Sequence, residues 1–284
     1  MHKTLLREDI TVPDISSNGI TLHYTDTGGE GRPVVLIHGW PLNGRSWADQ
    51  EGALVDAGYR AIAYDRRGFG SSDKPESGYD YDTMAADLAG LLDGLDLTDV
   101  TLVGFSMGGG EVARYLGTHC DARVRSAVLA AAVPPYLLKT DDNPDGGLGE
   151  DDVQGMIDGV TSDREGFLDQ FTTAFFSVDG ELAVTEDQRQ QALALEAPSA
   201  DAALAGCIAA FGRTDFREDL AKISVPTLVI HGDSDATVPF EISGKRSAEA
   251  ISQSTLIVVE KAPHGLNVSH REEFNNALLE FLKD

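Results

Sequence analysis

A serine between two glycines is the clearest candidate for chemistry in this sequence. Residues 104–108 read Gly-Phe-Ser-Met-Gly, at the end of an apolar run (100–105) and ahead of a helical pattern at 112–116. A strand-to-helix turn of this type tolerates almost no side chain at its glycines and lifts the serine hydroxyl above a sheet at a helix N-terminus. The alternative is a plain glycine-rich turn with an N-capping serine. The flanking strand and helix patterns favour Ser106 as a nucleophile.

A serine hydroxyl is a weak nucleophile, so it needs a nearby base and a third group that orients the base. His264 follows an apolar run at 256–259, and Asp233 and Asp235 follow another at 227–230. Open α/β sheets build their sites where such strands end, and the chain order serine, aspartate, histidine is that of hydrolases. A surface-loop histidine and turn-forming aspartates are the alternatives. We favour His264 as base and Asp235 as its orienting acid, with Asp233 as the fallback.

Acyl transfer also needs N–H donors aimed at the oxyanion of the tetrahedral intermediate. The backbone N–H of Met107, directly after the serine, is one candidate. The second is the N–H of Trp40 in the loop His-Gly-Trp-Pro (38–41), because Pro41 has no N–H to donate. The alternative for this loop is a rigid turn with Trp40 as a core aromatic.

Metal chemistry finds no support in the remaining histidines and cysteines. The cysteines, Cys120 and Cys207, lack C-x-x-C spacing, and the histidines form no H-E-x-x-H set (His2, His23, His38, His119, His231 and His270). We read both cysteines as buried thiols in a reducing compartment. The segment 1–13 mixes charges with single leucines, and the chain contains no run of eighteen apolar residues. We therefore expect a cytoplasmic protein without a membrane partner.

The charge balance excludes several classes of protein. The 284 residues include 22 basic and 47 acidic side chains, a net charge of -25, and 42% of them are hydrophobic. This composition excludes disorder, collagen and basic nucleic-acid binders. The acidity disfavours anionic substrates, and it reflects either ordinary solubility or adaptation to high salt. Homo-oligomerisation stays open at this point.

Short apolar runs alternate with helical patterns, which is typical of strands buried on both faces of a parallel sheet. The alternating residues 20–25 predict a strand of an opening antiparallel pair, and the apolar spacing at 274–282 predicts a terminal amphipathic helix. The strand signal disappears between the Pro134-Pro135 pair and Arg217. We therefore expect an α/β core at 1–133 and 217–284, with an all-helical cap at 134–216.

Six short segments form a recurring set of motifs: His-Gly-Trp-Pro-Leu (38–42), Tyr-Asp-Arg-Arg-Gly-Phe-Gly-Ser-Ser (64–72), Gly-Phe-Ser-Met-Gly-Gly-Gly (104–110), Thr-Asp-Phe-Arg-Glu-Asp-Leu (214–220), His-Gly-Asp-Ser-Asp (231–235) and Ala-Pro-His-Gly-Leu (262–266). Together they resemble the cofactor-free haloperoxidases of the α/β-hydrolase family. The resemblance covers nearly the whole chain and is weaker in the cap and the first twenty residues. In that family the second carboxylate of Gly-Asp-x-Asp orients the histidine, which selects Asp235, and the Trp40 and Met107 amides match the oxyanion hole.

The resemblance implies a serine esterase for small carboxylic esters that needs no haem, vanadium or other cofactor. Hydrogen peroxide would intercept the acyl-Ser106 in place of water, and the peracid formed would oxidise halide off the enzyme. Trp40 followed by Pro41 is the family variant associated with peroxide use. A plain carboxylesterase or lactonase is the alternative within enzymes, and a small-molecule receptor is the alternative outside them.

Two further expectations concern side chains around this site. The cap aromatics Phe171, Phe175 and Phe176 are spaced so that they could roof an acyl pocket together with Trp40 and Met107; ordinary packing of a cap helix is the alternative. From the same resemblance, residues 65–67 (Asp-Arg-Arg) are expected to form structural ion pairs beneath the site.

Overall fold

The structure is a computed structural model that describes residues 13–119 and 122–283. Its centre is an eight-stranded sheet in the order β1-β2-β4-β3-β5-β6-β9-β10. β1 and β2 form the expected antiparallel pair, β2 runs antiparallel to β4, and every pairing from β4 to β10 is parallel. The strands of this sheet are β1 (Asp14–Ser17), β2 (Ile20–Asp26), β3 (Pro33–Ile37), β4 (Arg60–Tyr64), β5 (Val100–Phe105), β6 (Val124–Ala130), β9 (Thr227–Gly232) and β10 (Ser254–Val259).

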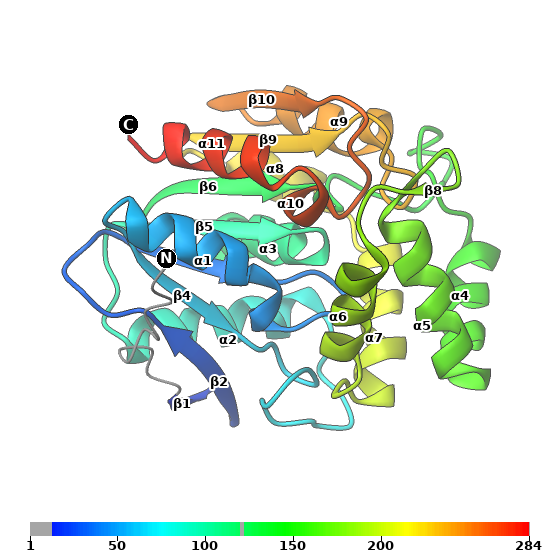
Figure 1. Cartoon of the computed structure of the whole chain (residues 1–284), viewed down its shortest axis with the longest axis horizontal. Coiled ribbons are helices and arrows are strands. Elements are labelled where there is room, and N and C mark those ends of the chain that lie inside the picture. The colour runs from blue at the N-terminus through cyan, green and yellow to red at the C-terminus, as the bar shows by residue number, and fades with distance from the viewer. Residues whose placement is uncertain (1–12, 120–121, 284) are drawn as a thin grey trace, which may run out of the picture.

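Helices cover both faces of the sheet (Figure 1). On one face α1 (Ala48–Asp56) packs beside α11 (Arg271–Phe281), and on the other α2 (Tyr81–Gly94), α3 (Met107–His119), α8 (Arg217–Lys222) and α9 (Gly244–Ala250) lie in a row. The predicted terminal helix is α11, and it buries Phe274 and Leu278. The remaining short helices are η1 (Gly44–Trp47), η2 (Phe240–Ile242) and α10 (Leu266–Ser269).

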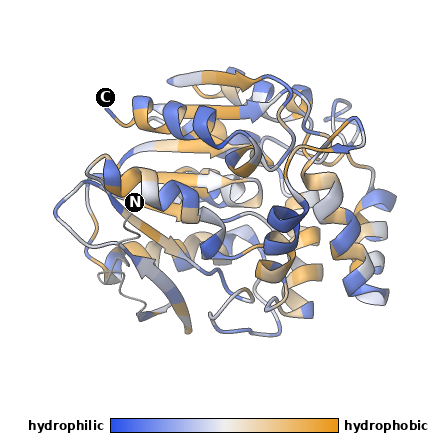
Figure 2. Cartoon of the chain, viewed as in Figure 1, coloured by the Kyte–Doolittle hydropathy of each residue, from blue (hydrophilic) through white to orange (hydrophobic). Residues whose placement is uncertain are grey.

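The central strands are apolar because both of their faces are buried. In β3, Val34 and Leu36 belong to one hydrophobic cluster, whereas Val35 and Ile37 belong to the cluster on the opposite face. Successive side chains of a strand point to opposite faces, so an uninterrupted apolar run serves both layers. Figure 2 shows this as hydrophobic colouring along the inner strands.

The segment between β6 and α8 lies beyond the carboxyl ends of the parallel strands (Figure 1). It contains α4 (Glu150–Ser162), α5 (Arg164–Phe175), α6 (Glu186–Glu196) and α7 (Asp201–Arg213). The sequence predicted an all-helical segment, and this was wrong: β7 (Ser177–Val178) and β8 (Glu181–Leu182) form a small antiparallel hairpin. Gly180 has φ +85°, the left-handed conformation that a tight hairpin turn requires. The division at residues 134 and 216 stays our proposal for the limits of the cap.

In the described part of the chain, no single helix has both the length and the apolar character needed to cross a membrane; α6 and α7 pass that test only as a pair bent by 103°. The described residues also include neither Cys120 nor residues 1–12, so the interpretations placed on them lie outside this structure.

Candidate active site

Ser106 occupies the sharp turn between β5 and α3. Its φ is +53°, a left-handed conformation that is rare for a residue with a side chain. The glycines around it are required by close backbone approaches: a Cβ on Gly104 would lie 2.4 Å from the Gly108 carbonyl oxygen, and one on Gly108 would lie 2.4 Å from the Ile37 oxygen. The tight turn predicted at 104–108 is therefore present, and the serine side chain stands at the N-terminus of α3.

The structure brings the three residues of the expected triad together. His264 Nε2 lies 2.9 Å from Ser106 Oγ, and His264 Nδ1 lies 2.7 Å from Asp235 Oδ2. Since a carboxylate only accepts hydrogen bonds, Nδ1 carries the proton and the Nε2 lone pair faces the serine hydroxyl. All three side chains are buried. This arrangement can take a proton from Ser106 and hold the resulting imidazolium beside a carboxylate.

Asp233 points elsewhere, although it is only two residues from Asp235. Its Oδ1 accepts hydrogen bonds from the Lys261 backbone N–H at 2.7 Å and from the Ser234 hydroxyl at 2.8 Å. It therefore joins two surface loops and does not face His264. The geometry agrees with the choice of Asp235.

Asp235 is ionised despite its burial. Burial alone would raise the pKa of this carboxyl, but its interactions with the adjacent imidazoles of His264 and His231 outweigh that effect and hold the pKa below its usual range. Its Oδ1 also accepts from the backbone N–H groups of Thr237, at 2.9 Å, and Val238, at 2.8 Å. The carboxylate is therefore fixed on both oxygens.

The loop after β3 carries Trp40, joined to Pro41 by a cis peptide bond. Two hydrogen bonds of the His38 ring fix this loop. Its Nε2 accepts from the Arg66 backbone N–H at 3.1 Å, so the ring proton lies on Nδ1, which donates to the Gly39 oxygen at 2.9 Å. Burial keeps the pKa of His38 well below its usual value, so the ring is neutral. The other predicted donor, Met107, is the first residue of α3, where an N–H has no intrahelical acceptor.

The cap is attached directly to this loop. The Trp40 indole N–H donates to the Leu204 oxygen at 3.2 Å, the Asn43 amide donates to the Leu195 oxygen at 2.8 Å, and the Ser199 hydroxyl donates to the Pro41 oxygen at 3.1 Å. The Trp40 ring also packs edge-on against Phe171 at 4.8 Å. Trp40 is thus both a cap contact and a site residue.

A cavity of about 50 Å³ opens onto Ser106. Of the residues expected to form the pocket, Trp40 and Phe171 line it, while Phe175 and Phe176 line a neighbouring cavity of about 190 Å³ between α1 and α6. Met107 is fully buried, and its carbonyl accepts from the Tyr81 hydroxyl at 3.2 Å. Most of the lining was not predicted from the sequence: Val133, Leu137, Leu148, Met156, Phe211, Thr237 and Val238. Apart from Thr237, the only signal for these residues was apolar character, which core residues share.

The ion-pair expectation for residues 65–67 was right for two residues of three. Arg67 forms a buried ion pair with Asp87 at 2.5 Å, and Arg66 Nε lies 3.3 Å from Glu111. Asp65 instead accepts from the Gly44 backbone N–H at 2.8 Å and from another loop amide. The Asp65 carboxylate therefore stabilises turns by accepting backbone hydrogen bonds, and it does not form the expected ion pair.

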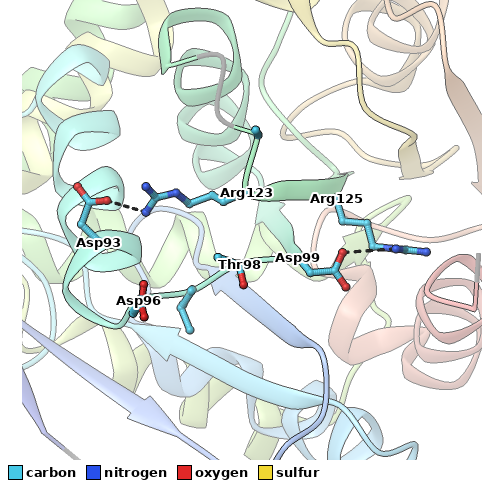
Figure 3. Close-up of a pocket in the computed structure, with 8 residues that line it drawn as sticks. Asp93, Asp96, Thr98, Asp99, Arg123 and Arg125 are labelled. Atoms are coloured by element: carbon cyan, nitrogen blue, oxygen red, sulfur yellow. Dashed lines mark hydrogen bonds and ion pairs between the residues drawn. The ribbon is translucent and has the colours of Figure 1, made fainter.

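A larger cavity, of about 530 Å³, lies at the opposite edge of the sheet, where β5 and β6 begin. Figure 3 shows that charged side chains line it and that two arginines pair across it, Arg123 with Asp93 at 2.6 Å and Arg125 with Asp99 at 3.4 Å. It contains no residue of the expected triad. Cavity volume alone would therefore have selected the end of the sheet where β5 and β6 begin, away from Ser106.

Known proteins are similar to this chain in sequence and in fold. A family model described as the alpha/beta hydrolase fold matches residues 32–270. A non-heme chloroperoxidase of Kitasatospora aureofaciens is 47% identical over 93% of this chain and 97% of its own, and a bifunctional esterase/perhydrolase of Acinetobacter calcoaceticus is 37% identical over 94% and 98%. The crystal structure of a bromoperoxidase from Bacillus anthracis, 52% identical, superposes with a TM-score of 0.93 over 96% of this chain and all of that one.

The chain belongs to the α/β-hydrolase fold family, and within it to the group of the non-heme haloperoxidases. The expected fold class and the resemblance drawn from the motifs are both confirmed. The protein is an enzyme of the hydrolase class.

Proposed function

We propose that this protein is a serine esterase for small carboxylic esters and that it also transfers the acyl group to hydrogen peroxide. The observation that carries the proposal is the continuous hydrogen-bonded path from Ser106 through His264 to Asp235, with contacts of 2.9 and 2.7 Å. The names of the relatives, chloroperoxidase and esterase/perhydrolase, support both halves of the proposal.

The geometry supports a two-step acyl transfer. Ser106 Oγ bonds to the ester carbon while His264 Nε2 takes the hydroxyl proton, and the imidazolium then protonates the departing alcohol oxygen. In the second step His264 removes a proton from water, whose oxygen bonds to the acyl carbon, and returns a proton to Ser106. The backbone N–H groups of Trp40 and Met107 stabilise the oxyanion of each tetrahedral intermediate.

Hydrogen peroxide replaces water in the second step. One peroxide oxygen bonds to the acyl carbon, the bond to Ser106 Oγ breaks, and a peracid leaves with its O–O bond intact. His264 takes the proton of the attacking peroxide oxygen and returns a proton to Ser106 Oγ, and the Trp40 carbonyl, held by the Pro41 ring, is our proposed hydrogen-bond acceptor for the other peroxide O–H. Free peracid then oxidises bromide or chloride in solution to the hypohalous acid and is itself reduced to the carboxylic acid.

The cavity favours short acyl groups. Its volume of about 50 Å³ is far below the roughly 300–1,000 Å³ of pockets that hold drug-sized ligands. Its lining is apolar apart from Ser106 and Thr237, and the net charge of -25 repels anions. Small neutral esters are therefore the proposed substrates. We place the enzyme in the cytoplasm, since Cys207 is a buried free thiol.

The test is hydrolysis of p-nitrophenyl acetate by wild type, Ser106→Ala and the exposed control Ser71→Ala, each with and without hydrogen peroxide and a peracid-sensitive bromide assay. We expect Ser106→Ala to lose both activities by at least about a thousandfold and Ser71→Ala to keep them. Unchanged activity in Ser106→Ala overturns the mechanism.

The same assay separates the alternatives. Ester cleavage without bromide oxidation identifies a plain esterase or lactonase. A receptor would release at most one equivalent of product, whereas an acyl-enzyme shows a burst and then steady turnover. Pro41→Ala tests the peroxide step by itself: we expect bromide oxidation to fall relative to hydrolysis.

A further inference from the structure

A second imidazole reaches the carboxylate of the triad. His231, near the end of β9, has its Nε2 3.3 Å from Asp235 Oδ2, the same oxygen that accepts from His264. His231 is fully buried, and together with His264 it holds the pKa of Asp235 below its usual range.

The protonation of the His231 ring follows from its other contact. Its Nε2 also lies 2.8 Å from the Val238 carbonyl oxygen, which can only accept, so Nε2 carries the proton. Its Nδ1 is buried without a hydrogen-bond partner, and the Gly244 backbone packs against it so closely that a Cβ there would lie 2.5 Å away. A proton on Nδ1 would be buried and unpaired, so the neutral ring with Nε2–H fits this pocket.

We propose that His231 is a positioning residue for the reaction: its Nε2–H donates to both Asp235 Oδ2 and the Val238 carbonyl, and thereby orients the carboxylate and moderates its basicity toward His264. The proposal rests on the triad assigned above. It uses the ring as a neutral donor, locked between Gly244 and Phe240, whose ring centroid lies 5.8 Å away.

Two consequences follow from the shared acceptor. With His231 present, Oδ2 divides its lone pairs between two N–H donors, so its pull on the His264 proton is weaker than that of an oxygen with one donor. Removing the His231 donor should therefore raise the pKa of His264. The Nε2–H of His231 also contacts the Val238 carbonyl, and Val238 lines the cavity beside Ser106. His231 therefore links the position of the Asp235 carboxylate to the position of the cavity wall.

The experiment compares His231→Gln with His231→Asn. The glutamine amide nitrogen can occupy the place of Nε2, whereas the shorter asparagine places its nitrogen near Nδ1 and cannot reach Asp235. A control on the same strand is Thr227→Val, at the far end of β9, where the hydroxyl donates only to the nearby Val225 carbonyl. Two quantities are measured: the acid limb of the pH profile of kcat/KM, and the His264 pKa by proton NMR in a Ser106→Ala background.

We expect the acid limb to move upward by about half a unit or more in His231→Asn, with kcat lowered about tenfold, and to stay near wild type in His231→Gln and Thr227→Val. The NMR pKa should move in the same direction. Equal limbs in the two His231 variants, or an equal shift in Thr227→Val, overturn the proposal. The NMR measurement requires no turnover, so it tests the role of His231 even if the protein has no esterase activity. Failure of the esterase proposal can therefore be distinguished from failure of this one.

Discussion

The Phe175 ring of the cap lies edge-on to the His264 ring, with centroids 4.9 Å apart and planes at 87°. The main chains are joined as well, because the Gly265 N–H donates to the Phe175 oxygen at 3.0 Å. The end of α5 therefore braces the loop that carries the proposed base. In this protein the cap supports the catalytic geometry and does not only cover the pocket.

Gly265 makes this close contact possible. A Cβ at this position would lie 2.3 Å from Phe176 and 2.6 Å from Phe175, so alanine must push the rings or the histidine loop aside. We expect Gly265→Ala to lower kcat at least tenfold and stability by about 1–3 kcal/mol. The control is Gly155→Ala on α4, where the added Cβ meets nothing within 4 Å. Kinetics and thermal unfolding of both variants provide the check, and unaltered kcat in Gly265→Ala would show that the contact has no catalytic role.

The two aspartates of the loop after β9 form a matched pair. Asp235→Asn replaces the acceptor of the His264 Nδ1 proton with an amide and favours the wrong tautomer, so we expect kcat to fall by about 10⁴. Asp233→Asn, in contrast, should retain activity within about threefold, because its partners are Lys261 and Ser234. Burst and steady-state assays at neutral pH measure both. Equal losses in the two variants would contradict the assignment of Asp235.

A buried carboxyl in the cap makes stability depend on pH. Burial raises the pKa of Glu196 to about 8, opposed in part by a 2.7 Å hydrogen bond from the Thr172 hydroxyl, and its second oxygen has no partner. An ordinary glutamate ionises near pH 4.5. Between these values the folded state binds more protons than the unfolded state, so the stabilising contribution of Glu196 is present below about pH 4.5 and is lost as pH rises to 8.

Glu196→Gln should remove this dependence. We expect the variant to gain on wild type as pH rises from 5 to 9, with a difference in unfolding free energy of at most about 5 kcal/mol. Urea unfolding across that range measures it, with exposed Glu165→Gln on α5 as the control. Parallel curves for wild type and Glu196→Gln would mean that this carboxyl ionises normally.

The net charge of -25 predicts a stability that depends on salt. Screening shortens the Debye length from about 30 Å at 0.01 M to about 3 Å at 1 M, which weakens repulsion between like charges. We expect the melting temperature to rise by about 5 °C or more over this range of KCl, as adaptation to high salt requires. The double variant Asp141→Asn, Asp145→Asn in the acidic cap loop should show a weaker dependence. A flat curve for wild type would leave only the solubility explanation.

Much of the fold was readable from short stretches of chain. The mainly apolar runs at 34–37 and 101–105 are central strands, because burial on both faces favours apolar side chains there. The β7–β8 hairpin was missed, since two-residue strands carry too little pattern to separate them from a loop. The cavity lining was not predicted, because apolar helix residues such as Met156 and Phe211 show the same sequence pattern whether they line a cavity or pack in the core.

The turn at Ser106 could be predicted from local sequence, because a strand, two obligatory glycines and a helix start are constraints within a few residues of one another. The sequence also placed His264 and the two aspartates at the ends of successive strands. The three-dimensional fold was needed to show that Asp235, and not Asp233, faces His264. It also brings Ser106 within 2.9 Å of a histidine 158 residues away and places His231 Nε2 3.3 Å from the same carboxylate. These relationships depend on how strands and loops distant in sequence pack, and local residue pattern does not encode that packing.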